Sequence, residues 1–225
     1  MSTSNQPRPN GAEAAPLELA IEHKPEARNA IVRRLCELVS WPESRIPAYE
    51  RQLAADILVG LLRTSSIDLR RQCAQGLVLI HDAPKALLRY LGRDEISVAG
   101  PLLESGVGFD DSDLIATVRA GVSAHWLALA RRRGLRESVT DALIVTGDVG
   151  VIEAVLKNSS ARLSTQGVDL AVARSRQAPS LPTLLVARNE LRPTQALVLF
   201  WWANFTARLH ILRRFAVDRG ILIQE

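Results

Sequence analysis

The sequence has few aromatic and sulfur-containing residues. Aromatic side chains make up 4% of its 225 residues, and there are two cysteines and one methionine. Strands favour aromatic and β-branched side chains, so this shortage argues against a strand-rich fold. Leucine, alanine and valine recur instead, and their apolar stripes run at helical spacing. We therefore predict an all-α protein.

The two cysteines form neither a disulfide framework nor a metal motif. Cys36 and Cys73 are far apart in the sequence, and each falls in an apolar helical pattern, so we expect two small buried side chains in a reducing compartment. The N-terminus lacks the charged start and apolar block of a secretory signal, and no apolar run reaches the ~18 residues that span a bilayer. These absences predict a cytoplasmic protein without a membrane partner.

Residues that could carry catalysis or bind a metal follow no known arrangement. No serine lies in a nucleophile elbow, and no glycine-rich loop follows a strand. The histidines fall in unrelated segments, and we expect His125, beside Trp126, to be a helix cap or a solvent-facing side chain. We predict no catalytic, cofactor or metal site and no enzyme activity. The four histidines are His23, His81, His125 and His210.

The densest acidic cluster has two interpretations. Asp110, Asp111 and Asp113 with Glu104 could supply oxygen ligands to a divalent cation, but they lack the spacing of a calcium loop. Carboxylates at the start of a helix also accept its free backbone N–H groups and suit the positive end of its dipole. We favour this second interpretation and predict an N-cap.

The second half of the chain repeats a unit of two short helices. Apolar anchors at Phe109, Leu135, Leu163 and Leu191 are separated by 26, 28 and 28 residues. A repeat of this size is the signature of an α-solenoid, in which a unit buries its apolar face only when neighbouring units stack. The second helix of each unit is predicted over residues 111–120, 137–146, 164–174 and from 193 onward.

The remaining segments of the chain lie before and after this repeat. Residues 1–25 are predicted to be a mostly disordered tail, and the solenoid domain to span residues 26–220. Early in the domain, Pro47 is expected to start a helix. A further helix and then a short one over residues 84–90 are expected to follow it. The apolar stripe predicted for the helix that starts at Pro47 consists of Leu53, Ile57, Leu58, Leu61 and Leu62. Residues 221–225 form the predicted C-terminal end.

The last predicted helix carries the most apolar surface. No breaker lies between Pro193 and Arg219, so we expect one long capping helix. It holds more large apolar residues than one face can bury, which predicts an outward-facing interface for self-association or for another segment. Adjacent residues point about 100° apart on a helix, so Trp201 and Trp202 can take different roles, although packing of both in the core is slightly favoured.

The segment from Asp94 to Ser105, together with Leu199-Phe200-Trp201-Trp202, resembles a bacterial HEAT-like helical-repeat family known only as a domain of unknown function. The resemblance covers residues from about 30 to 222. It implies a right-handed α-solenoid of short HEAT-like helix pairs with a long C-terminal capping helix, and it implies no reaction. Relatives are expected to continue beyond the tryptophan pair, so an end at Glu225 would then be a truncation.

Arginine supplies nearly all of the positive charge, because the sequence contains three lysines and has a net charge of +4. Arg131, Arg132, Arg133 and Arg136 end one repeat helix, where they complement its dipole or bind an acidic peptide or phosphate. They join the tryptophan pair as candidate partner-binding residues.

Two functions are open to such a chain. The first is a non-catalytic protein–protein interaction scaffold, since stacked helix pairs present an extended groove. The alternative is a nucleic-acid-binding protein resembling the HEAT-like alkyl-base DNA glycosylases, in which the arginine cluster, Trp126 and Asp141 would form the site. The net charge is small, so this alternative predicts weak and salt-sensitive DNA binding at most.

Overall fold

The computed structural model describes residues 25–41, 46–80, 82–106 and 108–222. Within those ranges, regular secondary structure consists of thirteen helices and no strand, which confirms the all-α prediction. The helices are α2 (Pro25–Val39), α3 (Ala48–Leu62), α4 (Ile67–Val78), α5 (Lys85–Leu91), α6 (Ile96–Glu104), α7 (Asp111–Ala120), α8 (Ser123–Arg131), α9 (Glu137–Val145), α10 (Val149–Lys157), α11 (Thr165–Arg174), α12 (Leu181–Val186), α13 (Pro193–Phe200) and α14 (Phe205–Leu222).

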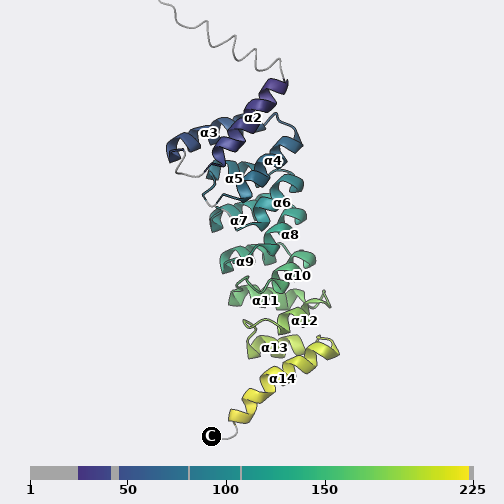
Figure 1. Cartoon of the computed structure of the whole chain (residues 1–225). Helices are drawn as coiled ribbons and strands as arrows, with labels where there is room; N and C mark the ends of the chain where they lie inside the picture. Colours follow the sequence, from purple (N-terminus) through teal and green to yellow (C-terminus); the bar gives the residue numbers. More distant parts are fainter. Residues whose placement is uncertain (1–24, 42–45, 81, 107, 223–225) are drawn as a thin grey trace, which may run out of the picture.

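The helices stack in two columns (Figure 1). In one column, each of α4, α6, α8, α10, α12 and α14 packs on the helix two elements before it. In the other, α7, α9, α11 and α13 follow one another in the same way, and α3 packs on α5. The described ends of the chain therefore lie at opposite ends of an elongated stack, with α2 at one end and α14 at the other.

Two hydrophobic cores run through this stack. The first extends from Val32 to Leu102 and the second from Ala99 to Ile211, and Phe109 packs against both. The predicted anchors Leu135, Leu163 and Leu191 are buried in the second core, as expected. Each short helix thus gains its stability from the helices before and after it.

Local signals predicted several helix boundaries well. The bounds of α7 are those predicted, and α9 ends one residue earlier than expected. Ser164 is the N-cap of α11, where its hydroxyl accepts a hydrogen bond from the Gly167 amide at 2.8 Å. The predicted tail lies outside the described residues except for Pro25, which begins α2.

The apolar stripe predicted for α3 is partly wrong. Leu58 and Leu62 are fully buried, but Leu53 and Ile57 are each 50% exposed. The buried side of α3 uses Ala54 and Ala55 instead, because α3 lies at the edge of the stack and packs against α2 and α5. Helical spacing identified the helix and only part of its buried face.

The single long helix predicted from Pro193 to Arg219 is also wrong. The chain forms α13, turns at residues 201–204 and begins α14 at Phe205. Asn204 causes the new start, since its side-chain oxygen accepts a hydrogen bond from the Ala207 amide at 2.8 Å. Arg208 fastens the turn by donating to the carbonyls of Phe200 and Trp201, each at 3.0 Å. The turn lets α14 pack against both α12 and α13.

Among the described residues, no helix has both the length and the apolar character needed to cross a membrane.

Candidate functional site

The predicted arginine cluster does not form a single patch. Arg131 pairs with Glu104 at 3.3 Å, and Arg136 lies 3.6 Å from Asp111. Arg131 and Arg133 line one shallow pocket with Lys157, whereas Arg136 lines a different pocket. Two of the exposed guanidinium groups are therefore already next to carboxylates.

Arg132, the fourth member of that cluster, is buried and serves the fold. Its side chain is 6% exposed and donates to the backbone carbonyls of Leu103 and Ser105 at the end of α6. Its guanidinium lies 5.8 Å from the centre of the Phe109 ring, and burial lowers the pKa of Arg132. Arg132 was a candidate partner-binding residue, but its burial and its bonds to backbone carbonyls give it a role within the fold.

The same kind of contact recurs one unit later. The Asn158 side-chain amide donates to the carbonyls of Ala130 and Arg132, at 2.8 and 2.7 Å. These carbonyls lie at the end of α8, where the last turn of a helix leaves its C=O groups without helical partners. Asn158 therefore satisfies the end of the preceding unit.

Arg188 and Arg214 continue this series. Arg188 donates to the carbonyls of Asn158 and Ala161, at 2.8 and 2.5 Å, and Arg214 donates to those of Val186 and Arg188, at 2.9 and 2.7 Å. We call Arg132, Asn158, Arg188 and Arg214 the carbonyl ladder. Sequence reasoning missed it, although its members are spaced at 26, 30 and 26 residues.

The acidic cluster acts at a helix start, as predicted. The Asp110 carboxylate accepts hydrogen bonds from the Ser112 hydroxyl at 2.6 Å and from the Asp113 amide at 3.0 Å, and it pairs with Lys85 at 3.1 Å. These contacts, with that of Ser112 the strongest, hold the pKa of Asp110 well below its usual range. No group of three or more metal-binding side chains occurs among the described residues.

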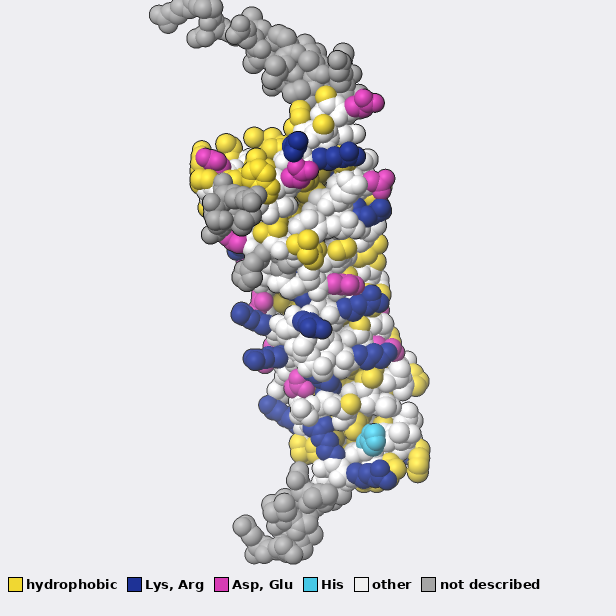
Figure 2. Space-filling view, in the orientation of Figure 1, with side chains coloured by type: hydrophobic (Ala, Val, Ile, Leu, Met, Phe, Trp, Pro, Cys, Tyr) yellow, Lys and Arg dark blue, Asp and Glu magenta, His cyan; other side chains and the backbone are white. Residues whose placement is uncertain are grey.

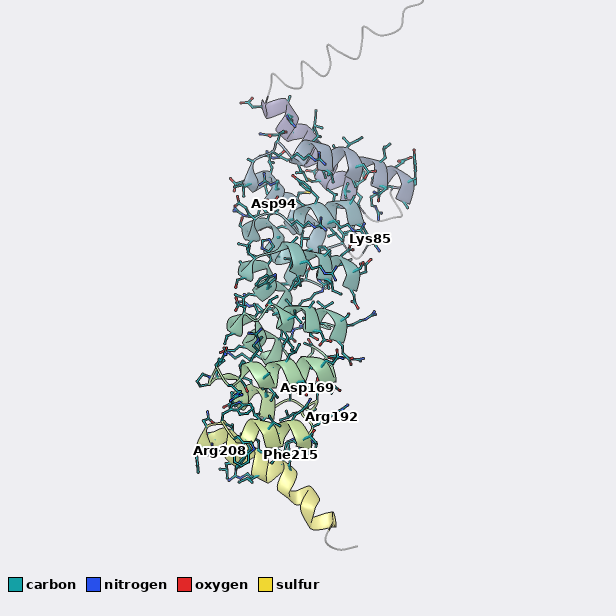
Figure 3. The ribbon with its side chains drawn as sticks, turned by 180° about the vertical axis from the view of Figure 1, so that it is seen from behind. Lys85, Asp94, Asp169, Arg192, Arg208 and Phe215 are labelled. Carbon is teal, nitrogen blue, oxygen red and sulfur yellow. The ribbon has the colours of Figure 1, made fainter. Side chains whose placement is uncertain are left out.

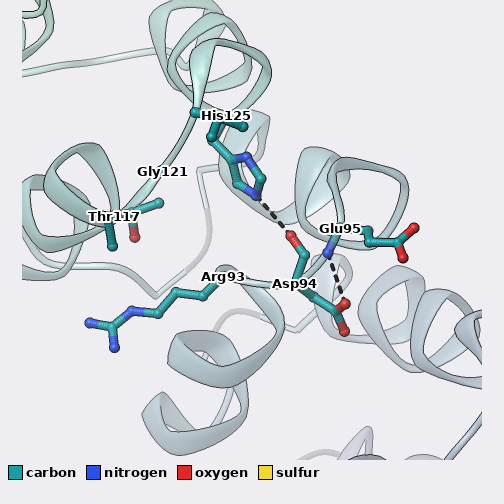
Figure 4. A pocket seen from close by; sticks show the side chains of 8 residues that line it. Arg93, Asp94, Glu95, Thr117, Gly121 and His125 are labelled. Carbon is teal, nitrogen blue, oxygen red and sulfur yellow. Dashed lines mark hydrogen bonds between the residues drawn. The ribbon is translucent and has the colours of Figure 1, made fainter.

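His125 lies in the interior rather than at a solvent-facing position. It is 9% exposed, and its Nε2 lies 2.8 Å from the carbonyl oxygen of Asp94 (Figure 4). The small pocket beside it, of about 310 Å³, is also lined by Arg93, Thr117 and Gly121. Its contact with Asp94 ties α8 to the start of α6, so this prediction is wrong. His23 and His81 lie outside the described residues.

The two cysteines are free and in contact with each other. Cys73 is buried as expected, whereas Cys36 is partly exposed. The hydrogen bond with Cys36, followed by burial, raises the pKa of the Cys73 thiol. Both thiols line a pocket between α2 and α4.

Trp201 and Trp202 have different environments. The Trp202 ring packs against the second core, and its Nε1 donates to the Ser175 hydroxyl at 2.8 Å. The Arg176 guanidinium lies 5.3 Å from the centre of that ring. Trp201 is 74% exposed. Packing of both indoles in the core, the slightly favoured interpretation, is therefore wrong.

Exposed apolar side chains continue from Trp201 along both last helices. Leu197 is 62% exposed on α13, and Phe205 and Leu212 are 80% and 51% exposed on α14. The opposite side of α14 is buried through Ala207 and Ile211. We call Leu197, Trp201, Phe205 and Leu212 the terminal apolar face. It matches the expectation that some apolar residues of this region point outward.

Positive charge is concentrated at the same end of the stack. Residues 174–215 contain seven arginines and one carboxylate, whereas residues 26–173 contain eighteen basic and eighteen acidic residues. Five of the seven arginines are exposed, and Figure 2 shows basic and apolar side chains side by side at this end. Figure 3 labels two of them, Arg192 and Arg208. The five are Arg174, Arg176, Arg192, Arg208 and Arg213.

Comparison with known proteins identifies a family without a known activity. No curated protein and no solved structure matches the chain. A family described as an uncharacterised protein conserved in bacteria (DUF2336) matches residues 98–225, more than half of the chain. This confirms the resemblance to a bacterial domain of unknown function. The match begins within one residue of the second core, which starts at Ala99. The chain therefore belongs to the DUF2336 family.

Proposed function

We propose that the protein is a non-catalytic protein–protein interaction scaffold, built as a right-handed α-solenoid of short HEAT-like helix pairs and located in the cytoplasm. The successive stacking of alternate helices supports the solenoid. The two free cysteines are consistent with a reducing compartment.

The terminal apolar face is the observation that carries the interaction role. Soluble proteins rarely leave several large apolar side chains exposed together unless they form an interface. Exposed tryptophan and arginine are also the side chains that most often dominate binding energy at protein interfaces. Trp201 and the neighbouring exposed arginines provide both at one end of the stack.

The charge excess at this end favours a second candidate, nucleic-acid binding. Phosphate contacts would use the exposed arginines between residues 174 and 215. The groups that a glycosylase-like site would need are already bonded, since the Trp126 Nε1 donates to the Val118 carbonyl and Asp141 accepts from the Ser164 hydroxyl, each at 2.8 Å. This candidate therefore draws its support from charge alone.

Photo-crosslinking in living bacteria tests the scaffold proposal. A photoreactive phenylalanine analogue would replace Trp201, and as a matched control it would replace Leu79, which is 88% exposed in the first half of the chain. We expect protein adducts from position 201 that are absent from position 79. Equal adducts at both positions would contradict the proposal, and adducts to nucleic acid would favour the second candidate.

A further inference from the structure

We propose that the terminal apolar face binds the acidic N-terminal segment, residues 13–22, of a second copy of this chain. This inference rests on the proposed interaction function and names the partner. It follows from the apolar and charged character of the face, the composition of the segment and the distance between the two ends of the stack.

The terminal apolar face sets the chemistry of its partner. It presents two aromatic and two aliphatic side chains, with Arg208 held beside Trp201 by a hydrogen bond to its carbonyl at 3.0 Å. The one carboxylate of residues 174–215, Glu190, is already paired with Arg188 at 2.7 Å. A matching partner needs apolar side chains to cover the face and carboxylates to meet its exposed arginines.

The N-terminal segment of the chain has this composition. Residues 13–22 contain Glu13, Glu18 and Glu22, no basic residue, and the apolar side chains Leu17, Leu19 and Ile21 among others. Few basic side chains lie close enough in the sequence to pair with these carboxylates in place of the arginines of the face. Residues 1–24 contain two, Arg8 and Lys24. Charge complementarity therefore favours this segment as the occupant.

The segment must come from another copy. Pro25 begins α2, at the opposite end of the stack from α14 (Figure 1). The column from α2 to α14 has six helix-to-helix spacings of about 9 Å each, or about 54 Å in total. Leu17 precedes Pro25 by eight residues, which span at most about 29 Å. The segment is therefore too short to reach the terminal apolar face of its own chain, and it must come from a second copy.

Analytical ultracentrifugation of the full-length protein tests the proposal. We expect the average mass to rise with concentration and to fall with added salt, because the contact is partly electrostatic. Trp201→Ala should weaken association about 30-fold, as expected for a binding hot spot. Val145→Ala is the control, since Val145 is 64% exposed on α9, away from both ends of the stack, and it should have no effect. Circular dichroism checks that each variant folds, and Phe205→Ala replaces Trp201→Ala if that variant does not.

A charge exchange tests the identity of the occupant. Two double variants are compared, Glu18→Arg/Glu22→Arg and Arg176→Glu/Arg213→Glu. Each variant should fail to associate when it is the only protein present, and a mixture of the two variants should associate again. Arg208 is left unchanged because it fastens the turn before α14.

Three results would overturn the inference. The protein could stay monomeric at every concentration, association could survive Trp201→Ala and Phe205→Ala, or association could be lost in those variants yet be insensitive to Glu18→Arg/Glu22→Arg. Trp201-dependent binding of a DNA fragment or of phosphatidylglycerol vesicles by a monomeric protein would also overturn it. Crosslinks from position 201 to a different protein would contradict this inference while leaving the scaffold proposal intact.

Discussion

The second core repeats one kind of polar contact between its layers, whereas the first core mixes two kinds. In the first, Arg70 forms a two-pronged ion pair with Asp94, at 2.6 and 3.1 Å, and Arg28 donates to the Leu61 carbonyl at the end of α3, at 3.4 Å. In the second, the carbonyl ladder places side-chain donors on backbone oxygens of the preceding unit. The family model covers the second core, so the ladder belongs to the region that defines the family.

Helix length differs between the two cores. In the first core, α2 and α3 have 15 residues each and α4 has 12, although α5 has seven, whereas in the second core α8 and α10 have nine and α12 has six. Every helix leaves its last four carbonyls without helical partners, so a short helix has a larger share of unsatisfied groups. Short units therefore depend more on donors supplied by their neighbours.

The largest change in stability is expected for Arg188→Ala. The substitution leaves the partly buried carbonyl of Asn158 and the buried carbonyl of Ala161 without this donor and Glu190 without its ion-pair partner, so it should lower the free energy of unfolding by about 3 kcal/mol. Urea unfolding followed by circular dichroism measures this. Arg174→Ala, at an exposed arginine of the same region, is the control and should change stability by less than about 0.5 kcal/mol. Equal effects would show that the ladder does not stabilise the second core.

A smaller effect is expected at the end of the second core. Trp202→Ala removes a half-buried ring and its hydrogen bond to Ser175, which should cost about 2 kcal/mol. Trp201→Ala should cost less than about 0.5 kcal/mol, since that side chain is 74% exposed. Thermal unfolding at low protein concentration separates these effects from association. Similar losses in both variants would contradict the different roles of the two indoles.

The ion pair between Arg70 and Asp94 in the first core should contribute still less to stability. Both side chains are mostly buried, so a double-mutant cycle of Arg70→Ala and Asp94→Ala should give a coupling energy of about 1 kcal/mol. The same cycle on the exposed pair Arg131 and Glu104 should give about 0.3 kcal/mol or less. If the exposed pair couples as strongly, burial is not what strengthens the first contact.

The smallest effect concerns acid. Hydrogen bonds from the Ser123 hydroxyl and the Val151 amide lower the pKa of Asp148, the N-cap of α10. A lowered folded-state pKa stabilises the protein above the pKa of the unfolded chain, about 3.9, and this contribution is lost as the pH falls through the folded value. Asp148→Asn should therefore be less stable than the wild type at neutral pH, and the gap should close in acid. A gap that is independent of pH would contradict this explanation.

The sequence predicted what depends on local chemistry. The bounds of α7 follow from the Asp110 N-cap, and the anchors Leu135 and Leu163 follow from the repeat period, since both signals can be read without knowing which helices pack together. The buried face of α3 could be predicted only in part. Whether Leu53 and Ile57 are buried depends on which helices pack beside α3, and helical spacing does not contain that information.

In the candidate site, too, the sequence did not reveal contacts between residues that are far apart in the chain. Exposed apolar residues near the C-terminus were predicted because their number exceeded what one helix face can bury, and Trp201 fulfils that prediction. Arg132 was mistaken for a binding residue because its partners, the carbonyls of Leu103 and Ser105, precede it by more than 25 residues. Backbone acceptors leave no mark in the sequence, so contacts to them are visible only in the fold.

The carbonyl ladder also affects how such a protein can change its length. Each donor reaches a helix end one unit earlier, so removing or duplicating an arbitrary stretch would leave a donor without acceptors and a helix end without a donor. A segment cut at equivalent points, such as residues 132–157, would instead join Asn158 to the end of α8 in the position that Arg132 now occupies. Gain or loss of whole units between ladder positions is therefore the change in length that this fold tolerates best.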